Sequence, residues 1–119
     1  IVASALAINW PQFSMGGYWA SFVMNQLDEY PYHCELSAVT DAALSACDSA
    51  DGIVDGIISD PDACVFDPFA LVGAQINCSD TGSLLRISAA TAKIVNATWT
   101  GARDSQGNFL WYGFNPGLH

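Results

Sequence analysis

The sequence predicts a mixed α/β fold with a real apolar core. Of the 119 residues, 51% are hydrophobic and the mean hydropathy is +0.26, which indicates a chain that buries a core. Residues 1–10 are predicted to be a short strand and the loop after it, because Ile1, Val2 and Ala3 are apolar without alternation, which is typical of a covered parallel strand. Three later segments carry apolar residues at helical spacing, so strand and helix patterns share the chain.

The first predicted helix extends from Gly17 to about Leu27. Its apolar residues recur at helical spacing, namely Tyr18, Trp19, Phe22, Val23 and Leu27. Large apolar side chains supply most of the burial in a core, so we expect these aromatic residues to pack there. The pattern ends at Pro31, because proline disrupts a helix interior.

Two further helices and a strand follow. The second helix runs from about Glu35 to Ala46, with an acid in its first turn and Leu36, Val39, Ala43 and Leu44 on one face. Ser88 can cap a third helix that ends at Gly101, and Ile94, Val95 and Trp99 share the buried side of that helix. Residues 103–108 form a predicted turn, and the aromatic segment 109–114 is a predicted strand.

The charge distribution excludes nucleic acid as a partner. The chain has twelve acids and three bases, and every acid except Asp104 precedes the first base, Arg86. Phosphate binding requires Lys and Arg, so this chain suits a metal cation or a cationic protein surface instead. No apolar run approaches the roughly 20 residues of a membrane-spanning helix, so we expect a soluble protein with no membrane partner.

Both ends of the sequence indicate a piece of a larger chain. The segment before Trp10 has no initiating Met and no basic region typical of a signal peptide, and the sequence stops at His119 just after a Pro-Gly pair. A natural small protein is the alternative interpretation, since domain sizes permit it.

Cysteines and glycosylation motifs together predict secretion. Four cysteines in an acidic chain suit an oxidising compartment, and they lack the spacing of a zinc site. Acceptor motifs for N-glycosylation occur at Asn96 and Asn77, although the second includes Cys78, whose pairing would hinder the modification.

The segment between Cys47 and Cys64 is a predicted calcium-binding loop. It contains five acids and no base, namely Asp48, Asp51, Asp55, Asp60 and Asp62. Calcium relieves the repulsion among such carboxylates and accepts six to eight oxygen ligands. A glycine follows both Asp51 and Asp55, which lets nearby carbonyls turn inward. The apolar residues Ile53, Val54, Ile57 and Ile58 can anchor the other side of the loop in the core.

The calcium site has three alternatives, which are an EF-hand, a magnesium site and a loop of simple turns. An EF-hand is excluded, because Ser59 stands where that motif needs a glutamate, and magnesium prefers fewer protein ligands. The two Asp-Gly pairs can instead be turn formers in a solvated acidic loop.

Pairing of Cys47 with Cys64 would leave Cys34 for Cys78, but four cysteines allow three connectivities, so the second pairing depends on the first.

The segment CDSADGIVDGIISDPDACVFDP resembles the signature of the tannase/feruloyl esterase family. The resemblance extends over the chain: IVASALAINW is similar to the family segment after the nucleophile elbow, with Ser4 and Leu6 where Gly and Pro are more usual. The fungal tannase-like branch of the family is more similar to this chain than the bacterial feruloyl esterase branch. The resemblance to that branch lies in the segments INCSDTGSLLRISAATAKIVNATWTG and LWYGFNPG.

The resemblance implies a fragment of an α/β-hydrolase fold, mainly its lid domain. Residues 1–30 would belong to the catalytic domain and residues 31–119 to the lid, which includes the calcium loop 47–64. The implied ligands of a structural calcium ion are the side chains of Asp48, Asp51 and Asp55 and the carbonyls of Ile53 and Ile57. The resemblance also supports the bridge between the two cysteines that flank this loop.

Family members hydrolyse aromatic acyl esters with a Ser-His-Asp triad, which the resemblance places outside this chain. The sequence has no G-x-S-x-G elbow, so we expect no catalytic residue here. The expected partners are the rest of the same esterase chain and a small galloyl or feruloyl-type ester. His33 is expected to be a hydrogen-bonded loop residue, and His119 ends the sequence.

Four aromatic residues of the last third could line an acyl pocket, although core packing is the more usual role: Trp99, Trp111, Tyr112 and Phe114. A non-catalytic, calcium-stabilised secreted binding module is the rival hypothesis.

Overall fold

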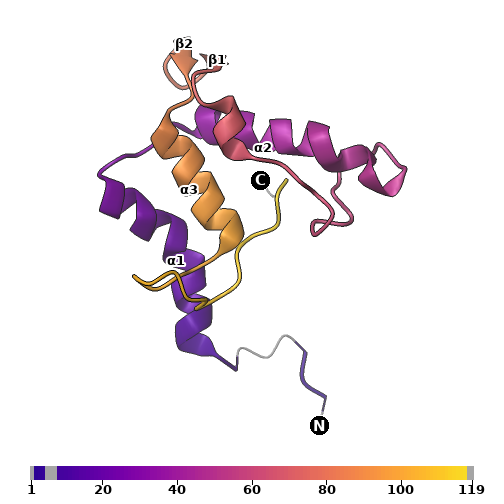
Figure 1. Ribbon diagram of the computed structural model, residues 1–119, viewed down its shortest axis with the longest axis vertical. Helices are drawn as coiled ribbons and strands as arrows, with labels where there is room; N and C mark the ends of the chain where they lie inside the picture. Colours follow the sequence, from indigo (N-terminus) through magenta and orange to yellow (C-terminus); the bar gives the residue numbers. More distant parts are fainter. Residues whose placement is uncertain (1, 5–7, 118–119) are drawn as a thin grey trace.

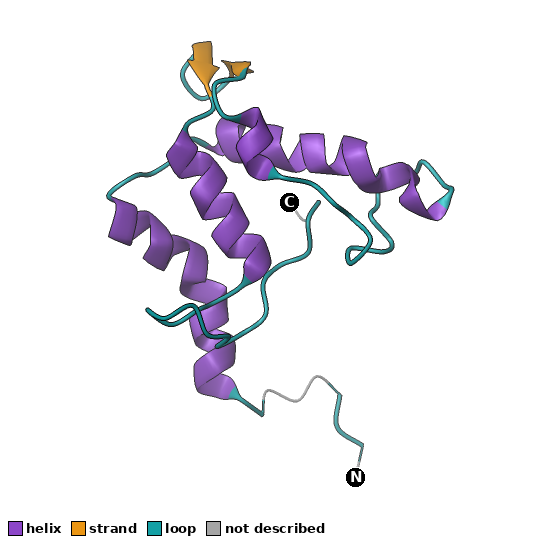
Figure 2. Cartoon of the chain, viewed as in Figure 1, coloured by secondary structure: helices purple, strands orange, loops and turns teal. Residues whose placement is uncertain are grey.

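The computed structural model describes residues 2–4 and 8–117 of the chain (Figure 1). Helices dominate it, and the two strands form one small hairpin (Figure 2). The elements in chain order are α1 (Trp10–Leu27), α2 (His33–Cys47), the short 3-10 helices η1 (Asp48–Asp51) and η2 (Pro68–Leu71), β1 (Gln75–Cys78), β2 (Ser83–Arg86) and α3 (Ala89–Thr100). Among the described residues, no helix combines the length and apolarity needed to cross a membrane.

The short strand predicted at the start of residues 1–10, before a loop, is wrong for the part of that segment that the structure describes. Residues 1 and 5–7 lie outside the described residues, residues 2–4 have no strand partner, and Trp10 already begins α1. A covered parallel strand needs neighbouring strands on the same sheet. The two described strands instead pair with each other, antiparallel, from Gln75 opposite Arg86 to Cys78 opposite Ser83.

Helix α1 begins seven residues before the predicted start at Gly17. Pro11 lies in its first turn, where the missing amide hydrogen costs nothing. Gly16 is required by packing, because a side chain there would overlap the indole ring of Trp111. Two adjacent glycines weaken the helical pattern in the sequence, but the contact with Trp111 compensates in the folded chain.

The expectation that the aromatic residues of α1 pack in the core is wrong for this chain. No residue of α1 is fully buried, and the side chains of Tyr18 and Phe22 are 72% and 44% exposed. Trp19 is half-buried, and its indole nitrogen donates a hydrogen bond of 3.1 Å to the carbonyl oxygen of Ala97 in α3. One side of α1 therefore packs against α3, where the ring of Phe22 stacks on that of Trp19 with 5.4 Å between centroids, while Tyr18 is largely exposed.

Helix α2 agrees with the prediction within two residues and is held by a disulfide at each end. The hairpin disulfide joins Cys34 to Cys78 in β1, and the loop disulfide joins Cys47 to Cys64. Figure 1 shows the β1–β2 hairpin near one end of α2 and the acidic loop at the other. The middle of α2 supplies Val39 to the core, where it packs with a set of apolar residues from other elements: Ile87, Val95, Phe66, Leu71, Ile76 and Trp99.

Helix α3 has the predicted caps. The hydroxyl of Ser88 accepts a hydrogen bond of 3.0 Å from the amide of Thr91, and Gly101 terminates the helix with a φ of 82°. At that end the C-terminal segment crosses the helix so closely that a side chain on Gly101 or on Gly113 would collide with the other segment's backbone. Two glycines thus permit a backbone crossing that no other residue type would allow.

The strand predicted over residues 109–114 is reduced to one isolated bridge between Phe109 and Arg103. The rest of the segment bonds to the end of α3 instead: the amide of Phe114 donates to the carbonyl of Thr98 at 3.0 Å, and that of Leu110 donates to Ala102 at 2.9 Å. The aromatic composition that favours a strand is therefore used here to cover the C-terminal turn of a helix.

Candidate functional site

The acidic loop is organised by Asp48, which follows α2 directly. This residue is only 9% exposed, and its Oδ1 atom accepts hydrogen bonds from the amides of Asp55, Gly56 and Ile57 at 3.2, 3.0 and 3.2 Å. A carboxylate that accepts three amides fixes the returning arm of the loop against the end of the helix. All three bonds end on Oδ1, so Oδ2 is the oxygen that would serve a cation.

Asp51 and Asp55 each form a turn with the glycine that follows. Asp51 accepts from the amide of Ile53 at 2.9 Å, and Asp55 accepts from that of Ile57 at 3.1 Å. The hydrogen bond from the Ile53 amide, followed by that from the Ser59 side chain, lowers the pKa of Asp51 below its usual value. Both carboxyl groups are exposed, and both glycines have positive φ as the Asp-Gly pattern predicts.

The apolar residues of the loop do not anchor it in the core of this chain. Ile53, Val54 and Ile57 are 59%, 79% and 59% exposed, so the prediction that they pack inside is wrong. Ile58 is half-buried and lies close to Gly117 near the C-terminus. The disulfide and the Asp48 hydrogen bonds hold the loop in place of an apolar anchor.

The donor set of the loop fits calcium in its chemistry. Its hard carboxylate oxygens are accompanied by no Lys, Arg or His between Cys47 and Cys64. Within the described residues, Cys34, Cys78 and Asp80 are the group of three whose ligand atoms lie within 4.8 Å of one another, and the two sulfurs there are already joined. No three carboxylates of the loop have oxygens that close to one another in the described residues; Asp48, Asp51 and Asp55 bond to backbone amides instead.

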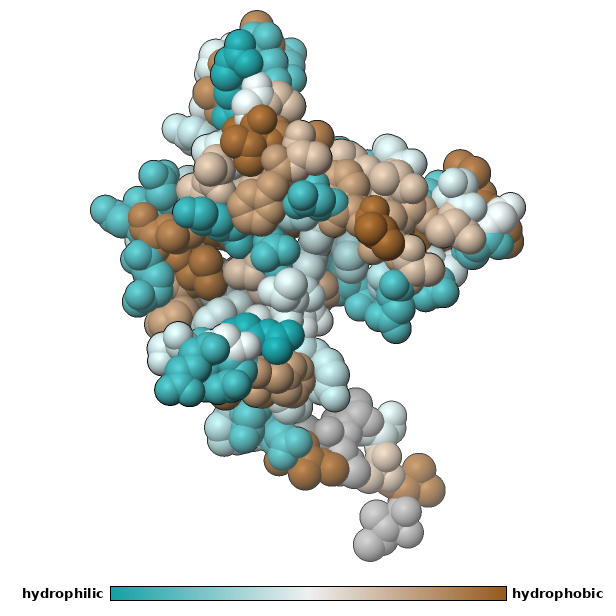
Figure 3. Space-filling model, viewed as in Figure 1, coloured by the Kyte–Doolittle hydropathy of each residue, from teal (hydrophilic) through white to brown (hydrophobic). Residues whose placement is uncertain are grey.

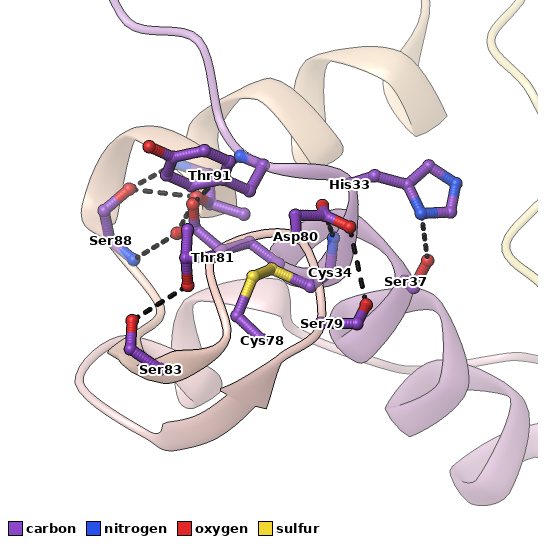
Figure 4. Close-up of a disulfide and its surroundings, with 12 residues drawn as sticks. His33, Cys34, Ser37, Cys78, Ser79, Asp80, Thr81, Ser83, Ser88 and Thr91 are labelled. Atoms are coloured by element: carbon purple, nitrogen blue, oxygen red, sulfur yellow. Dashed lines mark hydrogen bonds between the residues drawn. A yellow bond between two sulfur atoms is a disulfide. The ribbon is translucent and has the colours of Figure 1, made fainter.

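The hairpin disulfide lies in a polar setting (Figure 4). Asp80 accepts the amide hydrogen of Cys34 at 3.2 Å, and the Ser79 hydroxyl donates to the same carboxylate at 3.4 Å. The His33 ring is turned away from the disulfide toward Ser37, with 3.3 Å between Nδ1 and Oγ. His33 is the first residue of α2 and exposed, which makes this a surface helix contact and not a catalytic pair. His119 lies outside the described residues.

The two glycosylation motifs differ in exposure. Asn77 is exposed on β1, whereas Asn96 is half-buried on α3, which packs against α1. Cys78, which follows Asn77, is fully buried in the hairpin disulfide.

An apolar cavity of about 430 Å³ lies among α1, α2 and α3. Trp99 and Phe114 line it, and Thr40, Thr98 and Asn115 are the polar residues of the lining. The other two predicted pocket aromatics lie elsewhere: Trp111 borders a second cavity of about 210 Å³ beside α1, and Tyr112 is 72% exposed. The structure therefore divides this aromatic set between two cavities and the surface.

Glu35 is a buried carboxylate whose role exceeds the helix-dipole role predicted for it. It is 7% exposed, and its oxygens accept from the Tyr32 amide at 3.1 Å, the Thr91 hydroxyl at 2.9 Å and the Ser88 amide at 3.4 Å. It therefore caps its own helix and joins that helix to the start of α3. The sequence signal was a glutamate three residues after the helix-capping position of Tyr32.

Comparisons with known proteins place this geometry in a family. The sequence model described as tannase and feruloyl esterase matches residues 1–117. A probable feruloyl esterase from Arthroderma benhamiae is 36% identical over 111 residues, which are 93% of this chain and 20% of that protein. The chain thus spans about a fifth of the length of this relative.

Solved structures agree. The tannin acyl hydrolase from Aspergillus niger superposes with a TM-score of 0.77 at 27% identity, over 89% of this chain and 20% of that chain. Feruloyl esterase B from Aspergillus oryzae superposes with a TM-score of 0.65 at 28% identity, over 89% of this chain and 22% of that chain. The helix-rich fold with its small hairpin therefore resembles a segment of these larger proteins, and the chain belongs to the tannase and feruloyl esterase family.

Proposed function

We propose that the chain is part of a secreted serine carboxylic-ester hydrolase that acts on aromatic acyl esters, either galloyl esters of tannins or feruloyl-type esters. The family match over residues 1–117 carries this proposal, and the relatives named tannase and feruloyl esterase support the substrate class. Two disulfides support secretion, because such bonds persist in oxidising compartments.

Within that enzyme, residues 31–119 serve as the lid and residues 1–30 contribute to the catalytic domain. The serine nucleophile and its histidine base lie outside this chain, so no residue here is assigned a catalytic role. What the chain offers a substrate is the cavity beside Trp99 and Phe114, whose volume and apolar lining suit one phenolic ring.

The acidic loop holds a structural calcium ion in this proposal. The side chains of Asp48, Asp51 and Asp55 and the carbonyls of Ile53 and Ile57 would hold it, and the ion would neutralise the local negative charge. The support is the donor chemistry of the loop and its closure by a disulfide.

The proposed esterase activity is tested with the full-length gene that encodes this chain. We expect a G-x-S-x-G motif shortly before Ile1 and hydrolysis of methyl gallate or methyl ferulate by the full-length product. Residues 1–119 alone are expected to be inactive. A signal peptide in place of the motif, or hydrolysis by residues 1–119 alone, would contradict the proposal.

The pocket is tested in the full-length enzyme with two aromatic substitutions. Phe114→Ala should raise KM for the aromatic ester, because Phe114 lines the cavity, whereas Tyr112→Ala should leave KM unchanged because that side chain is 72% exposed. Equal effects of the two substitutions would exclude this cavity as the acyl pocket.

The calcium site is tested by chelation. A ligand that binds only the folded state stabilises it, so excess EDTA should lower the thermal midpoint and added calcium should restore it. Asp51→Asn and Asp55→Asn should weaken this response, and Asp62→Asn, an exposed acid of the same loop outside the ligand set, serves as the control. An unchanged midpoint, with no calcium found by metal analysis, would contradict the site.

The rival hypothesis is a non-catalytic, calcium-stabilised secreted binding module. It predicts the same response to EDTA but no esterase activity in the full-length protein, so the activity assay separates the two.

A further inference from the structure

Three segments of the chain meet around a small polar cavity of about 260 Å³. Its lining includes Glu29, Tyr30 and Tyr32 from the connection between α1 and α2, and Arg86 from the end of β2. Ser88, which caps α3, belongs to the third segment. Figure 1 shows the connection from α1 to α2 passing near the base of the hairpin. We call this space the linker cavity, and it shares no lining residue with the two apolar cavities.

Hydrogen bonds to other parts of the chain hold the walls of the linker cavity in place. The Tyr30 hydroxyl donates to Oδ1 of Asn25 at 2.8 Å, and Nη1 of Arg86 donates to the carbonyl oxygen of Gly73 at 2.8 Å. Glu35 also lines the cavity, and its three hydrogen bonds join the starts of α2 and α3. A site whose walls are fixed before binding loses less conformational entropy when a ligand arrives.

Two charged side chains of the cavity keep hydrogen-bonding capacity for a ligand. A guanidinium group has five N–H donors, and that of Arg86 makes one hydrogen bond within the described residues. The Glu29 carboxylate is exposed and has no hydrogen-bond or ion-pair partner among residues 2–4 and 8–117. Glu35 and Ser88, in contrast, are engaged with Thr91 and with backbone amides. The cavity therefore offers one donor group and one acceptor group.

Aromatic rings supply the apolar part of the lining. Tyr30 and Tyr32 flank Pro31, and their side chains are 62% and 50% exposed. The face of a phenol ring is apolar and packs well against C–H groups, whereas its hydroxyl is polar. Figure 3 shows hydrophilic and apolar residues mixed on the surface where the hairpin meets the helices. A ligand that fits this lining needs both an apolar face and hydrogen-bonding groups.

Charge and size narrow the ligand class further. Glu29 and Glu35 carry two negative charges against one positive charge on Arg86, and the whole chain has a net charge of −9, which disfavours an anion. Arg86 disfavours a cation, and none of the lining residues belongs to the metal-ligand type of cluster found within the described residues. The volume is below the roughly 300–1,000 Å³ of sites for drug-sized molecules, so a single ring fits better than a longer ligand.

We propose that the linker cavity binds one neutral sugar ring. Each hydroxyl of a sugar both donates and accepts, so neighbouring hydroxyls can pair with the Glu29 carboxylate and the Arg86 guanidinium at once. The C–H face of the ring packs on the ring of Tyr30 or Tyr32. This site is additional to the proposed acyl cavity beside Trp99. The sugar is either the alcohol part of an ester substrate or a unit of a polysaccharide, and only the choice between these two sources rests on the proposed function.

The first experiment measures sugar binding to the full-length protein by saturation-transfer-difference NMR. The probes are methyl glucoside and methyl arabinoside. Methyl glucuronide is the anionic comparison, and cyclohexanol is a ring with a single hydroxyl. We expect saturation of the C–H protons on one face of each neutral sugar, and affinities at least about fivefold lower for the two comparison compounds.

Matched substitutions tie this binding to the linker cavity. Glu29→Gln and Tyr30→Leu should each raise Kd for the neutral sugars by about fivefold or more, because they remove a charged acceptor and an aromatic face. Glu29→Gln should fold normally, since this carboxylate has no partner to lose within the described residues. Asp62→Asn and Tyr18→Leu are the controls, an exposed acid and an exposed tyrosine that line none of the three cavities, and should leave Kd unchanged.

Three results would overturn the proposal. They are an absence of sugar binding, binding of the comparison compounds as tight as that of the neutral sugars, and the same Kd in Glu29→Gln as in Asp62→Asn.

Ester hydrolysis identifies the source of the sugar and separates this inference from the proposed function. If the ring is the alcohol part of the substrate, Glu29→Gln should raise KM for galloyl glucose or feruloyl arabinose and leave KM for the methyl esters unchanged. If it belongs to a polysaccharide, every KM should stay unchanged while the variant loses affinity for unesterified arabinoxylan. Sugar binding by an inactive protein supports the cavity and refutes the esterase, whereas an active esterase that binds no sugar refutes the cavity alone.

Discussion

Removal of the Glu35 carboxylate should destabilise the chain more than removal of any exposed acid. Glu35→Ala takes away the acceptor of three hydrogen bonds, two from backbone amides at 3.1 and 3.4 Å and one from the Thr91 hydroxyl at 2.9 Å. Both helices start at this point, so the substitution acts on the first turn of α2 and on the first turn of α3 at once.

The magnitude follows from what each donor can do afterwards. The Tyr32 amide belongs to an exposed residue and can bond to water, so its loss costs about 1 kcal/mol, as for other capping interactions. Thr91 is fully buried, and a hydrogen bond to a charged group contributes about 1.5–3 kcal/mol. Ser88 offers Thr91 another partner at 2.9 Å, which limits the penalty. We expect a loss of about 3 kcal/mol in the free energy of unfolding.

Urea unfolding followed by circular dichroism measures this loss. Glu35→Gln keeps the volume but replaces one acceptor by a donor, so about 1–2 kcal/mol should be lost. Glu29→Ala removes a nearby exposed carboxylate and should change the free energy of unfolding by less than about 0.5 kcal/mol. If Glu35→Ala were as mild as Glu29→Ala, the link between the two helices would not be a stabilising one.

Three further outcomes are expected. Gly17→Ala should stabilise the chain by roughly 0.5–1 kcal/mol because nothing lies near the added carbon, whereas Gly16→Ala should destabilise it by displacing Trp111. Urea unfolding of the two variants measures both effects, and a stabilising Gly16→Ala would refute the contact between Gly16 and Trp111. Asn108→Ala should raise the pKa of Asp104 in a carboxyl NMR titration, since the Asn108 side chain is the main cause of its lowered pKa, and an unchanged value would refute that cause. A carboxyl with a lowered pKa stabilises the fold above its unfolded pKa of about 3.8 and loses that contribution as pH falls through the lower folded pKa, so the variant should be less sensitive to acid below that value. Serine in place of both cysteines of the loop disulfide should cost roughly 3 kcal/mol in urea unfolding by the loop-closure estimate, and a negligible loss would show that the loop is closed equally well without it.

The helices were predictable where local chemistry marks their ends. Ser88 and Gly101 bound α3 in the sequence and in the structure, because both caps depend on neighbouring residues alone. The start of α1 was missed because its two glycines weaken the helical pattern, and the reason for Gly16 is its contact with Trp111, which lies far along the chain. Partners distant in sequence do not show in a local pattern.

The strands were predicted less well than the helices, because strand pairing also depends on residues distant in the sequence. The β1–β2 hairpin was not predicted, since its strands are short and its turn depends on Gly82 at a φ of 64°. Two predicted strands are absent from the described residues, because a strand also needs a partner at the right distance, and residues 109–114 find the end of α3 instead.

The acidic loop was predictable in composition but not in its internal bonds. Its cysteines pair as the sequence suggested, and its glycines adopt positive φ. The sequence did not indicate that Asp48 would be nearly buried and would accept three amides from the far arm of the loop. The same carboxylates suit a turn and a cation, and the residue pattern alone does not separate those uses.

The two disulfides at the ends of α2 have a mechanical consequence. Helix ends usually fray, so their amide hydrogens exchange with solvent faster than those in the middle. Both ends of α2 are covalently tied to other segments, and its terminal amides should therefore exchange nearly as slowly as its central ones, unlike those of α1. Because both disulfides join α2, the helix holds the β1–β2 hairpin and the acidic loop at its opposite ends.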